Sequence, residues 1–124
     1  MAIIGAHTLL YSSEPDKLRA VLRDAFGLAH VDVGHGWLIF TAPPSEIAVH
    51  PADADAGEDA GRHQLTFMCD DIVVTVRELR AKGIVIAGEP KEERWGVHVT
   101  MQLPGGVPVM LYQPKHPTAI GGGV

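Results

Sequence analysis

Histidine is the residue type with the greatest capacity for chemistry in this sequence, which has seven histidines and a single cysteine. Imidazole binds metals and titrates near neutral pH, so a histidine can be a metal ligand, a general base or a polar contact. His7 lies 57 residues before Gln64, and His35 lies 63 residues before His98. These similar intervals place the members of each pair at equivalent positions of a repeated unit. No nucleophile elbow, Walker loop or zinc-finger spacing accompanies them.

The composition excludes several classes of partner. Fifteen acidic residues against ten basic ones give a net charge of -5, whereas nucleic-acid binding needs a surplus of Lys and Arg. The single Cys69 rules out an internal disulfide and is typical of a reducing compartment. The N-terminus has neither a basic leader region nor an apolar run of membrane-spanning length. We therefore expect a cytoplasmic protein with no nucleic-acid or membrane partner.

Hydrophobic spacing predicts the same βαβββ order twice. In the first unit, strands are expected at 3–11, 30–33, 36–41 and 45–50, with a helix from about 15 to 26 that ends at Gly27. In the second, strands are expected at 63–69, 84–87, 97–103 and 107–112. Its helix begins after Asp70 or Asp71 and ends at Gly83.

The repeat predicts an α+β fold of two tandem βαβββ modules in a single domain, 1–124. Module one covers about 3–50, an acidic linker about 51–62, module two about 63–114, and a flexible tail 115–124. A ferredoxin-like domain is the alternative, but that fold has four strands where this pattern predicts about eight. Strand alternation places one set of side chains on a shared face: His7, Tyr11, Gln64, Met68, Met110 and Tyr112.

Three segments resemble the vicinal oxygen chelate superfamily, whose members include glyoxalases, extradiol dioxygenases and bleomycin-resistance proteins. FMCDDIVVTVRELRAKGI at 67–84 is similar to the strand, Asp-Asp, helix and Lys-Gly segment that opens the second unit of that superfamily. LPGGVPVMLYQP at 103–114 resembles its last turn and strand, and Trp95-Gly96 its aromatic-Gly pair. The resemblance implies that the two sheets form a cup-shaped, partly open barrel around a small molecule, and that the protein is a homodimer.

The resemblance also implies four positions for the ligands of a divalent metal, in the first and last strand of each unit. They fall on His7, Ile47, Gln64 and Met110. Isoleucine cannot bind a metal, and a thioether is a poor ligand for Fe²⁺, Mn²⁺, Mg²⁺ or Zn²⁺. A register one residue away offers His7, Glu46 and His63, but it turns the apolar set of each strand outward. We expect no metal cofactor, with His7 and Gln64 as the ligands if a divalent metal binds.

These residues favour a protein that binds a small apolar or aromatic molecule, in the manner of resistance and sequestering members. The alternatives are a metal-dependent lyase, isomerase or extradiol-type dioxygenase that uses His7, and a metal-free enzyme with His7 or His98 as acid–base catalyst. His98 falls near a position where relatives carry a donor toward the ligand, and Trp37 and Trp95 are candidates for the pocket wall. The predicted ligand-binding residues are His7, Tyr11, Gln64, Met68, Trp95, His98, Met110 and Tyr112.

Overall fold

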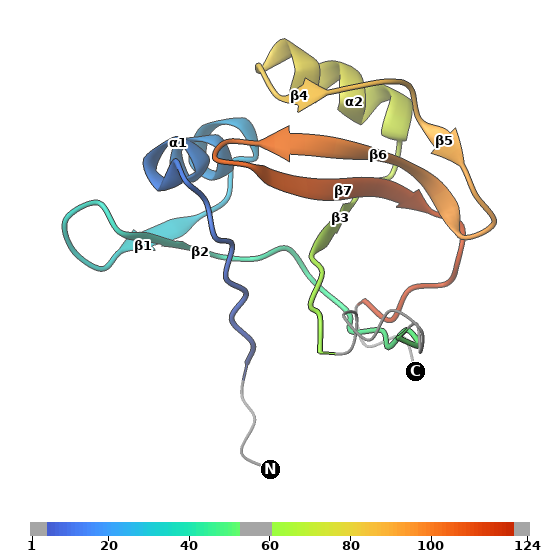
Figure 1. Ribbon diagram of the computed structural model, residues 1–124, viewed down its shortest axis with the longest axis horizontal. Coiled ribbons are helices and arrows are strands. Elements are labelled where there is room, and N and C mark those ends of the chain that lie inside the picture. Colours follow the sequence, from blue (N-terminus) through green and yellow to red (C-terminus); the bar gives the residue numbers. More distant parts are fainter. Residues whose placement is uncertain (1–4, 53–60, 121–124) are drawn as a thin grey trace.

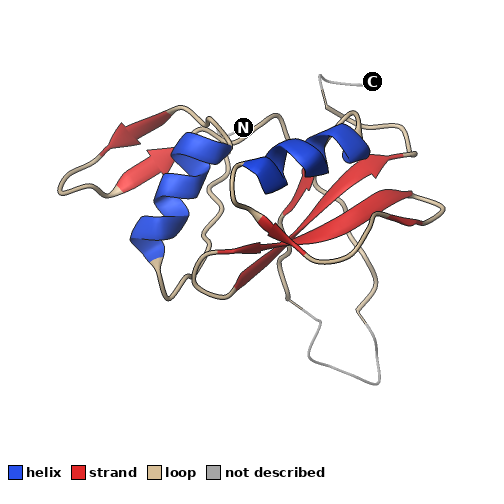
Figure 2. Cartoon of the chain, turned by 90° about the horizontal axis from the view of Figure 1, so that it is seen from above, coloured by secondary structure: helices blue, strands red, loops and turns tan. Residues whose placement is uncertain are grey.

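The computed structural model describes residues 5–52 and 61–120, and within them two helices lie on one face of a curved, unclosed sheet (Figures 1 and 2). The predicted mixed fold is therefore confirmed. No helix in the described part of the chain is long and apolar enough to cross a membrane. Most of the expected acidic linker, 53–60, lies outside the described residues.

The second module forms a five-stranded sheet. Its strands are β3 (Thr66–Met68), β4 (Val85–Ile86), β5 (Lys91–Glu92), β6 (Gly96–Leu103) and β7 (Val107–Pro114). The central path is β3-β7-β6-β4, with β5 also paired to β6, and β3 runs parallel to β7 while the other pairs are antiparallel. β5 was not predicted, because a two-residue strand of Lys and Glu has no apolar pattern.

The helix α2 (Ile72–Ala81) covers one face of this sheet. Asp71 is its N-cap, as predicted, and accepts a hydrogen bond from the Val74 amide at 3.1 Å. The Gln113 side chain of β7 accepts another from the Ile72 amide at 2.9 Å, which ties the helix start to the sheet. Beneath the helix, every second residue of the two long strands is buried: Val99, Met101 and Leu103 from β6, and Val107, Val109 and Leu111 from β7.

The first module contributes the predicted helix, as α1 (Pro15–Ala20) followed by the π-helical turn η1 (Val21–Ala25). Leu18 of α1 is buried in the same core as the second module, and Phe26 meets Phe67 of β3 edge to face at 5.4 Å. The strands β1 (His30–Asp32) and β2 (Leu38–Phe40) form a separate antiparallel hairpin. The two helices therefore share one core, while the first module's hairpin lies outside the main sheet.

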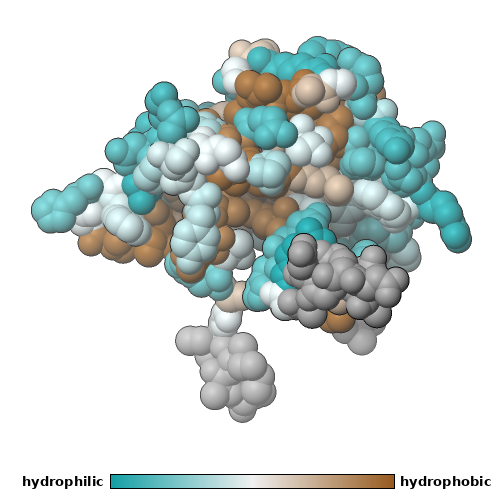
Figure 3. All heavy atoms as spheres, in the orientation of Figure 1, coloured by the Kyte–Doolittle hydropathy of each residue, from teal (hydrophilic) through white to brown (hydrophobic). Residues whose placement is uncertain are grey.

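Two predicted strands of the first module, 3–11 and 45–50, are not formed over their described residues, 5–11 and 45–50, so this prediction is wrong. A strand needs a neighbour to satisfy its amides and carbonyls, and neither segment has a paired neighbour among the described residues. Most side chains of both segments are exposed, with Ile47 at 90% and Val49 at 92%, although Leu10 packs against the core. Hydrophobic surface also gathers over the β1–β2 hairpin (Figure 3).

The two modules meet where the β6–β7 turn touches the start of the first helix. The Ser12 hydroxyl donates to the Pro104 carbonyl at 2.7 Å, and the Ser13 amide donates to the Gly105 carbonyl at 3.1 Å. Gly105 has a φ of +84°, and an added Cβ would collide with Ser12 Oγ and lie 2.7 Å from the Ser13 amide nitrogen. Glycine is therefore required here both for its backbone conformation and for the close approach of the two modules.

We predict that Gly105→Ala lowers the free energy of unfolding by about 1 to 3 kcal/mol more than Gly106→Ala, because it forces the modules apart. Gly106 is the matched control, since its φ is also positive, at +78°, but its Cβ would meet open space. Urea unfolding of both variants measures the difference. Equal losses of free energy of unfolding in the two variants would mean that Gly105 is not in close contact with Ser12 and Ser13 in solution.

Candidate functional site

The face of the five-stranded sheet opposite α2 carries four of the eight predicted ligand-binding residues. Residues directly opposite each other in a ladder share a face. Met68 pairs with Tyr112, Tyr112 with His98, and His98 with Lys91, so these four side chains form one row across β3, β7, β6 and β5. Thr66, Met110 and Thr100 form the neighbouring row. The structure thus brings Met68, Met110, His98 and Tyr112 together on what we call the open face.

Four rings gather at one end of the open face: Trp95, His98, Tyr112 and His116, here called the ring cluster. Trp95 stacks on His98 with centroids 5.0 Å apart and meets the edge of Tyr112 at 5.6 Å. The rings of Tyr112 and His116 lie 5.8 Å apart. Trp95 remains 41% exposed, whereas Tyr112 is buried. Sequence reasoning predicted three of these residues and missed the fourth.

His116 was missed because it lies in the expected flexible tail, beyond the last predicted strand. Its Nε2 is 3.0 Å from the Tyr112 hydroxyl, and its Nδ1 is 2.8 Å from the Pro117 carbonyl. The neighbouring Lys115 amide donates to the Trp95 carbonyl at 2.9 Å, and the Ala119 amide donates to Glu46 at 2.7 Å. These bonds hold residues 115–119 beside the ring cluster. The signal available in the sequence was a histidine four residues after a tyrosine on the predicted open face.

Gly96 allows the ring cluster to form. A Cβ at this position would lie 2.6 Å from the Gln113 carbonyl oxygen and 3.1 Å from Cδ2 of Tyr112. The Tyr112 ring therefore lies against bare backbone, and Trp95 can reach it from the adjacent position. This contact gives a physical reason for the Trp95-Gly96 pair in the sequence.

The remaining predicted residues lie apart from the ring cluster or at its margin. His7 and Tyr11 are on the unpaired segment 5–11, where Tyr11 is 85% exposed. Gln64 precedes β3 and is also exposed, and its amide oxygen accepts from Arg62 at 3.4 Å. Trp37 is on the β1–β2 hairpin, under the guanidinium of Arg19 at 4.7 Å, and does not belong to this site.

The four metal-ligand positions implied by the family do not fit a divalent metal in this chain. Ile47 offers no donor atom, and Met110 pairs with Thr66 and Thr100, so neither of those cross-strand neighbours is a carboxylate. Within residues 5–52 and 61–120, no group of three His, Cys, Asp or Glu side chains is placed to hold a metal ion. Hard divalent cations favour carboxylates, and the open face does not present them at these positions.

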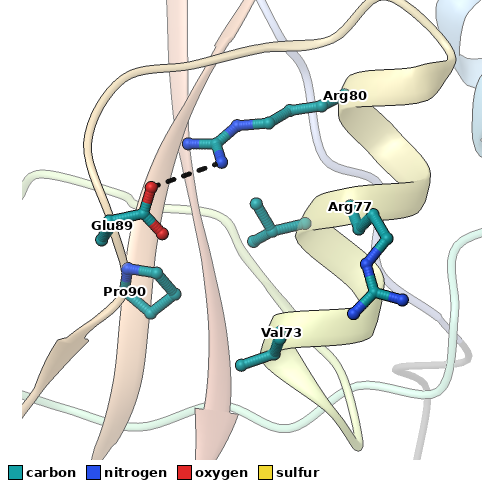
Figure 4. A pocket seen from close by; sticks show the side chains of 6 residues that line it. Val73, Arg77, Arg80, Glu89 and Pro90 are labelled. Carbon is teal, nitrogen blue, oxygen red and sulfur yellow. Dashed lines mark ion pairs between the residues drawn. The ribbon is translucent and has the colours of Figure 1, made fainter.

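A hollow of about 290 Å³ lies elsewhere, between α2 and the segment that joins β4 to β5 (Figure 4). Arg80 extends across it toward Glu89, with a nitrogen–oxygen distance of 3.7 Å. The same guanidinium donates to the carbonyls of Ile86 and Gly88, at 2.9 and 2.6 Å. Arg80 therefore fastens the β4–β5 connection to the helix, and none of the predicted site residues lines this hollow.

Burial raises the pKa of the Tyr112 hydroxyl, and the nearby charge of Glu46 adds to the effect. A group whose pKa is raised on folding contributes stability below its unfolded pKa, about 10 for tyrosine, and loses it as the pH rises through the folded value.

We predict that the difference in free energy of unfolding between wild type and Tyr112→Phe becomes smaller between pH 9 and pH 11, because the raised pKa of Tyr112 makes its ionisation unfavourable in the folded protein. Urea unfolding at several pH values measures it, with Tyr11→Phe as the exposed control. If the difference in free energy of unfolding between wild type and Tyr112→Phe stays constant over this pH range, the pKa of the Tyr112 hydroxyl is not raised by folding.

Comparisons with known proteins agree with this architecture. The sequence profile of the Glyoxalase/Bleomycin resistance protein/Dioxygenase superfamily matches residues 5–111. The chain is similar to the structure of TnmS3, an antibiotic binding protein from Streptomyces sp. CB03234, with 20% identity and a TM-score of 0.65 over 93% of this chain and 99% of that one. No curated protein sequence matches the chain.

Two further solved structures share the fold. A lactoylglutathione lyase from Agrobacterium tumefaciens is 20% identical, with a TM-score of 0.61 over 91% of this chain and 94% of that one. A superfamily member from Sphaerobacter thermophilus DSM 20745 is 17% identical, with a TM-score of 0.59 over 91% of this chain and 99% of that one. From the profile match across both modules, we conclude that the chain belongs to the Glyoxalase/Bleomycin resistance protein/Dioxygenase superfamily, the vicinal oxygen chelate proteins.

Proposed function

We propose that this protein binds a small apolar or aromatic molecule on the open face, without the family's four-ligand metal site, and that it does so as a cytoplasmic homodimer. The observation that carries the proposal is the composition of that face. It combines a half-exposed tryptophan, two thioethers and two histidines at positions that β3, β6, β7 and the segments beside them hold in place. Small-molecule sites are largely apolar with a few well-placed polar groups.

The structural neighbours include both a binding protein and an enzyme. One structural neighbour is described as an antibiotic binding protein, which is consistent with binding without a reaction. Another is a lactoylglutathione lyase, so the fold alone does not exclude an enzyme. The ligand set favours the first of these, because a lyase or dioxygenase that depends on a metal needs donors that Ile47 and Met110 do not supply.

We predict that purified protein dialysed against Mn²⁺, Fe²⁺, Ni²⁺ or Zn²⁺ retains far less than one ion per chain, as measured by elemental analysis. His7→Ala and the control His35→Asn, in the exposed turn between β1 and β2, should give the same low value. Retention of one ion per chain that is lost in His7→Ala but kept in His35→Asn would overturn the metal-free proposal. It would favour the alternative of a metal-dependent lyase or dioxygenase.

The exposed apolar surface of the first module supports the dimer. Val31 pairs with Ile39, and Val33 and Trp37 lie on the same face of the hairpin, where all four are exposed. Leu9 and Tyr11 of segment 5–11, and Ile47 and Val49 of segment 45–50, are exposed as well. The corresponding segments of the second module, β3 and β7, pair with each other. Apolar surface of this extent on a soluble domain marks an interaction site, and unpaired strand segments favour pairing with another chain.

We predict that size-exclusion chromatography with light scattering gives twice the 13.3 kDa mass of one chain. Val49→Lys should shift the population toward monomer, because a lysine cannot be desolvated in an apolar interface without a partner. Val73→Lys, at the hollow beside α2 in the second module and 60% exposed, is the matched control and should leave the mass unchanged. A wild-type mass of 13.3 kDa at all concentrations would contradict the dimer and leave the ligand proposal standing.

A further inference from the structure

We propose that the ring cluster selects a neutral, planar aromatic ligand that carries a hydrogen-bond donor, such as an N–H or O–H group. This inference rests on the proposed function and names the chemical class of its ligand. It follows from the hydrogen bonds that the polar rings already make, because these bonds decide which atoms are left to face a ligand.

His98 is left with an acceptor. Its Nε2 lies 3.4 Å from Oε1 of Glu93, and an ionised carboxylate can only accept a hydrogen bond. When the imidazole carries a single proton, that proton sits on Nε2, and Nδ1 keeps a lone pair. A ligand group that meets Nδ1 must donate. Trp95 stacks on the same imidazole and limits how far the ring can turn.

Tyr112 is also left with an acceptor. The Pro117 carbonyl can only accept, so Nδ1 of His116 carries the proton and Nε2 of the same ring accepts from the Tyr112 hydroxyl. The tyrosine has no second proton to offer, and its oxygen retains only lone pairs. The raised pKa of Tyr112 keeps the hydroxyl protonated at neutral pH, which preserves this arrangement.

Trp95 provides the flat surface for the ligand. His98 covers one side of the indole and Tyr112 touches it edge-on, yet 41% of the residue is exposed. Planar groups that stack on such a surface gain affinity beyond the burial of area. The ligand is therefore expected to be aromatic and flat, with its donor directed toward the imidazole.

The carboxylates beside the polar rings disfavour an anionic ligand group placed against His98 or Tyr112. Glu93 lies beside His98, and the charge of Glu46 acts on Tyr112. The nearest lysines are paired with carboxylates: Lys91 with Glu93 at 3.7 Å, and Lys115 with Glu92. A carboxylate ligand would bring further negative charge and acceptors to a surface that already presents acceptors.

The experiment compares three probes of nearly the same shape. Indole has an N–H donor, 1-methylindole lacks it, and indole-3-carboxylate adds an anion. The protein is the full chain with Trp37→Phe, which leaves Trp95 as its one tryptophan. Calorimetry gives each dissociation constant, and the single ¹⁵N-labelled indole signal of Trp95 reports whether the probe binds at the ring cluster.

We expect indole to shift the Trp95 signal and to bind about tenfold more tightly than 1-methylindole, the factor for one net hydrogen bond. Indole-3-carboxylate should bind more weakly than indole. His98→Phe keeps a ring under Trp95 but removes the acceptor, so it should abolish the preference for indole. Glu93→Gln is a milder second variant, because an amide can donate to Nε2 and move the imidazole proton to Nδ1. His30→Phe, whose ring meets Phe40 in the first module, is the control and should keep the preference.

Each other outcome overturns the inference. Equal affinity for indole and 1-methylindole at Trp95 would overturn donor selection, while the proposed function would stand. Tightest binding of indole-3-carboxylate would show that the site prefers anions. Binding of no probe would overturn the inference and count against the proposed function as well. A preference for indole that survives both His98→Phe and Glu93→Gln would remove His98 from the recognition of the donor.

Discussion

The β6–β7 ladder is the interaction on which the other parts of the molecule depend. It runs without interruption from Gly96 opposite Pro114 to Leu103 opposite Val107. β3 adds to one side of it, and β4 and β5 add to the other. One face of the ladder forms the core beneath α2, and the other carries His98 and Tyr112. Its turn meets the first module at Ser12 and Ser13, so a single hairpin fixes the core, the site and the module junction.

The side chains of the open face suit the proposed binding of an organic molecule better than they suit a metal site. The positions implied for metal ligands carry His7, Ile47, Gln64 and Met110 here, and of these only Met110 lies in a formed strand. Aromatic and thioether side chains are worth little to a hard cation but offer area and polarisability to a flat organic ligand. Gly96, the first residue of β6, and His116, after β7, then arrange the rings. Binding and metal chemistry are thus alternatives decided by a few side chains on the same strands.

The two modules differ in how completely the backbone hydrogen-bonding groups of their own strand segments are paired. In the second, β3 and β7 pair with each other and bury apolar residues under α2. In the first, the corresponding segments 5–11 and 45–50 have no described neighbour, and the hairpin exposes an apolar face. The helix α1 nevertheless packs into the second module's core through Leu18. In the single chain, the strands of the second module are therefore paired, whereas segments 5–11 and 45–50 of the first module are left without a described strand neighbour.

The sequence by itself determined the elements whose pattern is local. Asp71 and Gly83 marked the ends of α2, alternation marked β6 and β7, and the same alternation put Met68, Met110 and Tyr112 on one face. The metal misfit followed from side-chain chemistry alone. Only the tertiary structure decided whether 5–11 and 45–50 pair, because a strand forms when a neighbour takes up its hydrogen bonds. It also decided that His116 joins Tyr112, since the path of the chain beyond β7 depends on distant partners at Trp95 and Glu46.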